Sequence, residues 1–162
     1  MRLSPVVLSF VIASASVLPP ASAQTVKASA RGATDPVRVV EIIGTDDMKY
    51  SVTTITAKPG ETLRIRLTSK GKIPKVAMAH NFVLLKIGTN ILALLKEGAP
   101  HRNTDFIPTS MMSSVIARTG MAGPGETVQV SFTVPTRPGR YPYICTFAGH
   151  YQAGMKGTLI VK

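Results

Sequence analysis

One segment constrains the architecture of this chain more than any other, and it runs Tyr143-Ile144-Cys145-Thr146-Phe147-Ala148-Gly149-His150-Tyr151-Gln152-Ala153-Gly154-Met155-Lys156-Gly157. It contains a thiol at Cys145, an imidazole at His150 and a thioether at Met155. We expect Cys145 to end one β-strand and Met155 to open the next. The loop between the two strands can then fold these three side chains around one point.

The three side chains together favour copper. A soft thiolate and thioether beside an imidazole select copper among the biological metals, and blue-copper electron-transfer sites use two histidines, one cysteine and a distant methionine. Structural zinc is a weaker candidate, because it needs four strong ligands and methionine is a poor one. Taken singly, each residue has a plainer explanation, since buried cysteine and methionine often serve as apolar packing. Their order and spacing in a chain with a single cysteine favour the metal site.

Such a site needs a second imidazole, and the chain offers only His80 and His101 besides His150. His80 begins a predicted strand, where its backbone is rigid. His101 follows a proline in an irregular insertion over residues 88–112, where its position is poorly fixed. A rigid ligand set keeps geometry changes between two oxidation states small. We therefore expect His80 to be the ligand and leave the roles of His101 and the insertion open.

Short apolar segments divided by Gly, Pro and Asp precede these residues, as in an all-β domain. Thr62–Thr68 alternates most clearly, with Leu63, Ile65 and Leu67 directed inward. Residues 90–97 carry apolar side chains at helical spacing and predict a short helix. The other strands are expected at Val37–Ile43, Tyr50–Ala57, His80–Lys86, Ser114–Arg118, Thr127–Val134, Gly139–Cys145 and Gly157–Val161. Eight strands with one short helical insertion predict an all-β fold, an eight-stranded Greek-key sandwich or barrel.

The N-terminus has the features of a secretory signal over residues 1–23. Arg2 is followed by an apolar run from Val6 to Leu18, and Ala21-Ser22-Ala23 supplies the small residues of a cleavage site. The run is shorter than the roughly 20 residues that span a bilayer, so we expect no membrane span. Residues 24–36 are expected to form a flexible tail and residues 37–162 the copper-binding domain. The predicted location is the periplasm.

The formal net charge is +11 at pH 7. For an exported protein, this charge favours acidic proteins or anionic surfaces as partners and argues against nucleic acid, although scattered lysines also serve solubility alone. A single cysteine cannot form an internal disulfide, and an unpaired thiol in an oxidising compartment needs burial, a bridge to another chain or a ligand. Cys145 as a metal ligand satisfies that need, and we expect a monomer.

Several segments are similar to those of azurin-like cupredoxins, the type 1 blue copper proteins. Met78–Leu84 resembles the first-histidine segment of that family, and Cys145–His150 followed by Met155–Leu159 resembles its closing copper loop. Ser114–Thr119 and the early Asp46-Asp47-Met48 also fit. The resemblance runs from about Val37 to Lys162 and indicates a divergent member rather than azurin itself. It implies an eight-stranded Greek-key fold and one type 1 copper ion that alternates between Cu(I) and Cu(II).

The resemblance also implies roles for single residues. His80, Cys145 and His150 are the strong ligands in this comparison, and Met155 is the weak axial one. Asn81 and Phe147 would support the ligands, Asn81 through hydrogen bonds to the Cys145 loop. Azurin has a glycine before its first histidine whose carbonyl faces the copper, and here that residue is Ala79, which leaves this contact open. Ala148 replaces the usual proline, and the spacing from His150 to Met155 is one residue longer, as in plastocyanin-like members.

The expected function is electron transfer between periplasmic redox proteins, such as a c-type cytochrome or a copper or haem reductase with an acidic docking face. His150 would present an outer ring edge near the surface. The expected docking patch around it consists of Met48, Met78, Met121, Ala122, Phe147, Ala148 and Ala153. The alternative is a copper-binding or copper-delivery protein without an electron-transfer role. Catalytic copper needs further histidine pairs, so an enzyme is not expected.

Overall fold

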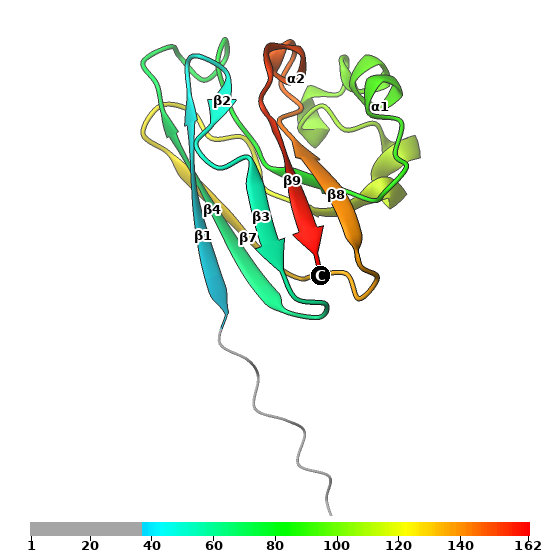
Figure 1. The fold of residues 1–162 in the computed structure, drawn as a ribbon. Helices are drawn as coiled ribbons and strands as arrows, with labels where there is room; N and C mark the ends of the chain where they lie inside the picture. Colours follow the sequence, from blue (N-terminus) through cyan, green and yellow to red (C-terminus); the bar gives the residue numbers. More distant parts are fainter. Residues whose placement is uncertain (1–36) are drawn as a thin grey trace, which may run out of the picture. The chain divides into compact units, whose positions relative to one another are not determined.

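The computed structural model describes residues 37–162, so the predicted signal segment and tail lie outside the described residues. Two mixed β-sheets face each other (Figure 1), with strand orders β2-β1-β4-β7 and β3-β9-β8-β5-β6. The strands are β1 (Arg38–Thr45), β2 (Lys49–Tyr50), β3 (Thr54–Ala57), β4 (Thr62–Lys70), β5 (Val83–Leu85), β6 (Val115–Arg118), β7 (Thr127–Thr133), β8 (Gly139–Ile144) and β9 (Lys156–Val161). The helices are α1 (Ile91–Gly98) and α2 (His150–Ala153), and the 3₁₀ turns are η1 (Arg102–Thr104) and η2 (Thr109–Ser114).

Strand β4 lies in the centre of the first sheet, parallel to β1 and antiparallel to β7. Its alternating residues Leu63, Ile65 and Leu67 are fully buried, as the sequence predicts. They belong to a core that fills the space between the two sheets and also contains Phe82, Tyr143, Cys145 and Met155. The outward residues form cross-strand contacts, such as Arg66 Nη1 donating to Glu41 Oε1 at 2.8 Å.

In the second sheet, β8 and β9 pair antiparallel from Gly139 opposite Val161 to Ile144 opposite Lys156. Because Cys145 follows the last residue of β8 and Met155 precedes the first of β9, this register places them side by side. The connecting loop, with α2, lies at the end of the sandwich opposite the C-terminus (Figure 1). The prediction that Cys145 ends one strand and Met155 opens the next agrees with this pairing to within one residue at each end.

The insertion between β5 and β6 packs against the outer side of the second sheet (Figure 1). Helix α1 begins where expected, with Asn90 Oδ1 accepting a hydrogen bond from the Ala93 amide at 3.0 Å, a normal N-cap. Leu94 and Ile107 are fully buried against residues of β5 and β8, in a second hydrophobic cluster. No helix within residues 37–162 is long and apolar enough to cross a membrane.

Three details differ from the sequence-based expectations. The predicted strand Tyr50–Ala57 is two strands in different sheets, β2 and β3, which raises the count from eight to nine. The predicted strand His80–Lys86 is regular only at β5, and His80 itself forms an isolated bridge to Ala122. The two sheets do not join into a closed barrel, so of the two predicted forms the sandwich is correct.

Candidate metal centre

Backbone hydrogen bonds fix the path of the loop from Cys145 to Met155. The Cys145 amide donates to the Met155 carbonyl at 3.1 Å, which extends the β8–β9 pairing by one step. The Met155 amide donates to the His150 carbonyl at 2.9 Å, and the His150 amide donates to the Phe147 carbonyl at 3.1 Å. Gly149 precedes α2 with φ +84° and allows the tight turn that directs His150 inward, because residues with a Cβ rarely adopt that conformation.

His80 reaches the same place from the other side of the fold. Its amide donates to the Ala122 carbonyl at 3.0 Å, and the Ala122 amide returns a bond to the His80 carbonyl at 2.8 Å. These two bonds hold the backbone of His80 between segments that are far apart in the sequence. The next residue, Asn81, is bonded to Thr146 beside Cys145, so both ligand-bearing segments are tied together.

The three strong candidate ligands converge. His80 Nδ1 lies 3.3 Å from His150 Nδ1, and Cys145 Sγ lies 3.4 Å from His150 Nδ1. The ligand atoms of all three residues lie within 4.8 Å of one another. Nitrogen and sulfur ligands that share a metal ion at roughly 2.0–2.3 Å are separated by comparable distances. Within the described residues, this is the only group of His, Cys, Asp and Glu side chains with such a geometry. His101 is exposed in the insertion and does not belong to it.

The centre is buried, and this burial sets the protonation of its groups. Cys145 and His80 are fully buried, and His150 is 2% exposed. Burial raises the pKa of the Cys145 thiol to about 12. Burial, and to a smaller extent the facing His80 ring, lowers the pKa of His150 to about 4. Burial also lowers the pKa of His80, opposed by the carboxylate of Asp46. At neutral pH these groups are therefore a thiol and two neutral imidazoles.

This donor set fits copper. Neutral imidazoles have lone pairs available for a metal, and the thiol becomes a thiolate ligand by releasing its proton when a cation binds. His80, Cys145 and His150 could provide the two imidazoles and one thiolate that a blue-copper site needs, and Met155 lies beside them with its thioether,. The chain has no second group of this kind in residues 37–162.

Met155 and Ala79 both border the group of candidate ligands. Met155 is fully buried. A Cβ built on Gly44 would lie 2.9 Å from both the Met155 methyl carbon and His80 Cδ2, so these two side chains meet at the glycine. The Ala79 carbonyl oxygen lies 3.8 Å from Cys145 Sγ, at the edge of the centre. Sequence reasoning missed Gly44, although a lone glycine inside an apolar strand often indicates a close approach of this kind.

Asn81 and Phe147 both contact the ligand-bearing segments. Asn81 Oδ1 accepts from the Thr146 amide at 2.9 Å, and Asn81 Nδ2 donates to Thr146 Oγ1 at 2.8 Å. The Phe147 ring lies on the His150 ring, with 4.8 Å between the ring centroids. The hydrogen bonds expected between Asn81 and the Cys145 loop are therefore present, and they go to the residue after the cysteine.

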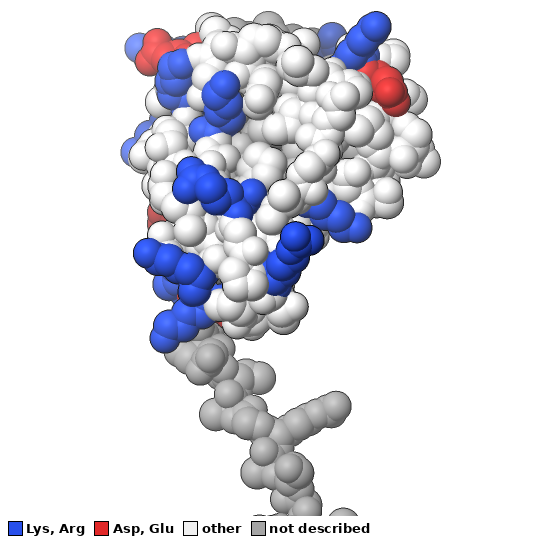
Figure 2. Space-filling view, turned by 45° about the vertical axis from the view of Figure 1, so that its right-hand side comes forward, with Lys and Arg blue, Asp and Glu red and all other residues white. Residues whose placement is uncertain are grey.

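The expected docking patch needs one correction. Ala122 is fully buried by its bridge to His80, so it adds no surface to a patch. Ala148 is exposed, and the other members are partly buried. Two further apolar residues are exposed in the segment before His80, Ile73 at 39% and Val76 at 73%, and the sequence pattern did not single them out. Figure 2 shows a broad uncharged face on the side that carries α1, bordered mainly by Lys and Arg.

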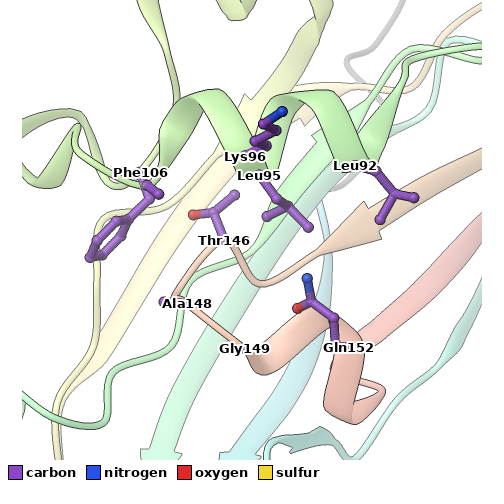
Figure 3. A pocket seen from close by; sticks show the side chains of 9 residues that line it. Leu92, Leu95, Lys96, Phe106, Thr146, Ala148, Gly149 and Gln152 are labelled. Carbon is purple, nitrogen blue, oxygen red and sulfur yellow. The ribbon is translucent and has the colours of Figure 1, made fainter.

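A cavity of about 260 Å³ separates α1 from the ligand loop (Figure 3). Leu92, Leu95 and Lys96 line it from α1, and Ala148, Gly149 and Gln152 line it from the loop. Phe106 and Thr146 close it. The loop that carries His150 therefore does not pack continuously against the helix of the insertion.

Known proteins resemble this chain in sequence and in fold. Residues 37–162 match the model of the copper-binding proteins of the plastocyanin/azurin family. The chain is 34% identical over 129 residues to auracyanin-B of Chloroflexus aurantiacus, which is 78% of this chain but 53% of auracyanin-B, about half its length. It is 35% identical over 127 residues to azurin of Pseudomonas aeruginosa, covering 76% of this chain and 84% of the azurin. The crystal structure of reduced auracyanin from the photosynthetic bacterium Roseiflexus castenholzii superposes with a TM-score of 0.66 at 31% identity, over 76% of this chain and 96% of that one.

Proposed function

Because the chain belongs to the plastocyanin/azurin family of copper-binding proteins, we propose that it is an exported blue copper protein that carries single electrons between periplasmic redox proteins. The observation that supports this most directly is the convergence of three buried ligand atoms, with His150 Nδ1 at 3.3 Å from His80 Nδ1 and at 3.4 Å from Cys145 Sγ. Copper, when bound, supplies a one-electron Cu(I)/Cu(II) couple.

The chain's own residues hold this couple in a fixed environment. His80 Nδ1, His150 Nδ1 and the Cys145 thiolate are the proposed strong ligands, with the Met155 thioether as the weak axial one. Ala79 offers its carbonyl oxygen as a further weak contact, at 3.8 Å from Cys145 Sγ. The bonds from Asn81 to Thr146 and the bridge of His80 to Ala122 oppose rearrangement of these ligands. A site that rearranges little between two oxidation states is suited to carrying electrons.

Partners would dock over the apolar end of the sandwich. The proposed patch consists of the exposed or partly exposed residues Met48, Ile73, Val76, Met78, Met121, Phe147, Ala148 and Ala153. Weak redox encounters use small interfaces, and methionine adapts to several partners. The net charge of +11, which becomes +10 when residues 1–23 with Arg2 are removed, favours an acidic docking face, for example on a c-type cytochrome or a copper or haem reductase,. Association with such a partner would slow with added salt.

Export rests on the first residues of the chain. We propose that residues 1–23 are a cleaved secretory signal, that residues 24–36 are a tail, and that a monomeric domain begins at residue 37. The protein is then a periplasmic electron carrier and not an enzyme. Detection of an N-terminus at Gln24 in protein recovered from a periplasmic fraction would support this. A mature chain that begins at Met1 would contradict it.

The test of the function is the absorption spectrum of the mature protein during titration with Cu(II). An intense visible band that saturates at one copper per chain, bleaches with ascorbate and returns with ferricyanide is the expected result. The band arises from the thiolate, so the Cys145→Ser variant serves as the control and should stay colourless. A colourless adduct of the natural chain would instead favour copper binding or delivery without electron transfer.

A further inference from the structure

Two consecutive residues of the insertion, Asp105 and Phe106, have left-handed backbones, with φ of +55° and +59°. Residues other than glycine rarely adopt such angles, and two in succession require support from the surroundings. Arg118 Nη1 of β6 donates to Asp105 Oδ2 at 2.6 Å. The Phe106 carbonyl lies so close to Gly98 that a Cβ there would be 2.0 Å from its oxygen. The turn is therefore held from both sides.

Asp105 reaches the segments of two candidate ligands through Thr146. The Thr146 hydroxyl donates to the Asp105 carbonyl at 2.5 Å and accepts from Asn81 Nδ2 at 2.8 Å. Thr146 follows Cys145 and Asn81 follows His80. The buried Thr146 hydroxyl therefore links the insertion to the residues that follow these two candidate ligands. Thr146 is 2% exposed, which makes loss of either bond costly,.

Phe106 reaches the third ligand through Phe147. The two rings meet edge to face, with 5.4 Å between centroids and an interplanar angle of 71°. Phe147 in turn lies 4.8 Å from His150. Edge-to-face pairs of aromatic rings are a favoured geometry, and they restrict the tilt of both rings. The Arg102 guanidinium lies over the Phe106 ring, with its Cζ 5.7 Å from the ring centroid.

Leu94 of α1 and Ile107 belong to the second hydrophobic cluster, against which Tyr151 of the loop packs. The cavity of about 260 Å³ separates α1 from Ala148 and Gly149 (Figure 3), so α1 does not press on the loop there. At residues 146–149 support from the insertion therefore comes from the Asp105–Phe106 turn, and Phe106 lines one side of that cavity.

We propose that Asp105 and Phe106 are positioning residues that hold the loop from Cys145 to His150 in its ligand geometry before copper binds. The turn contacts Thr146, which follows Cys145 and is bonded to Asn81, and Phe147, whose ring lies against that of His150. It contains none of the proposed ligands. For the copper-loaded protein, an inference that rests on the proposed function, the same contacts limit movement of His150 when the oxidation state changes. The alternative is that Phe106 only fills apolar space, in which case it would stabilise the whole domain without a specific effect on the loop.

The test compares amide hydrogen exchange in the metal-free natural protein and in Phe106→Ala. The reporters are the His150 and Met155 amides in the loop, and the reference is the Ile65 amide in β4. We expect exchange at the two loop amides to rise about tenfold or more relative to the reference, because local opening becomes easier. Phe106→Tyr retains the ring and should restore the natural values. Leu92→Ala, which enlarges the same cavity from α1, is the matched control and should leave the loop unchanged.

Thr146→Val is the second variant, since it keeps the shape of the side chain and removes the hydroxyl between Asp105 and Asn81. It should also raise loop exchange, and both variants should change the visible spectrum and slow electron self-exchange of the copper form. Equal increases at the loop and at Ile65, or failure of Phe106→Tyr to restore the loop, would overturn the inference. A natural protein without a blue copper form would refute the proposed function, while the exchange data would still decide whether the turn positions the loop.

Discussion

On one side of the candidate metal centre, His80 is placed by the global fold, whereas on the other side Cys145, His150 and Met155 are placed by one local loop. His80 depends on a bridge to Ala122 and on space beside Gly44, both distant in sequence. The loop depends on bonds among its own residues, such as the Met155 amide to the His150 carbonyl at 2.9 Å. The loop side is therefore specified largely by a short motif, with support from distant residues at Thr146 and Phe147, and the His80 side is specified by contacts between distant segments alone.

The largest expected effect is on the loop side. Cys145→Ser replaces the thiolate by a hydroxyl of similar size, which is a poor ligand for copper. We expect complete loss of the intense visible band on addition of Cu(II), measured by absorption spectroscopy. Circular dichroism of the metal-free variant should remain that of the natural protein, since the scaffold does not depend on the thiol. A band that survives the substitution would remove Cys145 from the centre.

The pH dependence of stability should distinguish the contributions of His80 and His150. Because the pKa of His150 is lowered to about 4 in the folded state, the unfolded chain binds more protons between pH 6.5 and 4,. The free energy of unfolding of the metal-free protein should therefore fall as the pH drops through this range, by up to roughly 3 kcal/mol from His150. The contribution of His150 should be constant below pH 4. Urea unfolding at several pH values measures this.

The matched variants for the pH series are His150→Gln and His80→Gln. His150→Gln should remove the greater part of the pH dependence, because burial acts most strongly on the pKa of that ring. A larger reduction of the pH dependence in His80→Gln than in His150→Gln would show that His80 is the ring with the lower pKa.

Substitution of one glycine on each side, Gly44 and Gly149, should give a smaller difference in stability. Gly44→Ala forces a Cβ to 2.9 Å from both His80 and Met155, and overpacking of this kind costs about 1–3 kcal/mol,. Gly149→Ala meets no atom within 4 Å, so only its φ of +84° opposes the substitution, with a cost of about 1 kcal/mol. We expect a greater loss of stability and a shifted blue spectrum for Gly44→Ala. Equal effects would show that the His80 side accommodates a methyl group without movement of the ligands.

The smallest effect is expected for a histidine that lies away from the candidate metal centre. His101 is exposed in the insertion and absent from the group of converging ligands. His101→Ala should leave copper binding, colour and stability unchanged, as measured by the same titration. Loss of one equivalent of bound copper would show that this imidazole was wrongly excluded.

The difference between the two sides also explains what the sequence could predict. The order of Cys145, His150 and Met155, the alternation in Thr62–Thr68 and the helix over residues 90–97 are local patterns, and the corresponding loop geometry, strand and helix are present. The division of Tyr50–Ala57 between two sheets was missed, because crossing from one sheet to the other leaves no local signal.

Contacts between segments that are distant in the sequence could likewise not be predicted from local patterns. Burial of Ala122 follows from its bridge to His80, a segment more than forty residues earlier in the chain. The left-handed backbones of Asp105 and Phe106 depend on Arg118, Thr146 and Gly98. None of these partners is evident from the residues of the turn alone, so both features required the three-dimensional arrangement.

The pairing of β8 with β9 has a consequence for how such a protein changes over evolutionary time. Ile144 opposite Lys156 is the last pair before the loop. A residue gained or lost between Cys145 and Met155 leaves every pair in those strands as it was. Selection can therefore alter the length and composition of the loop between Cys145 and Met155, and with it the chemistry of the metal, while the strand pairing of the sandwich stays the same.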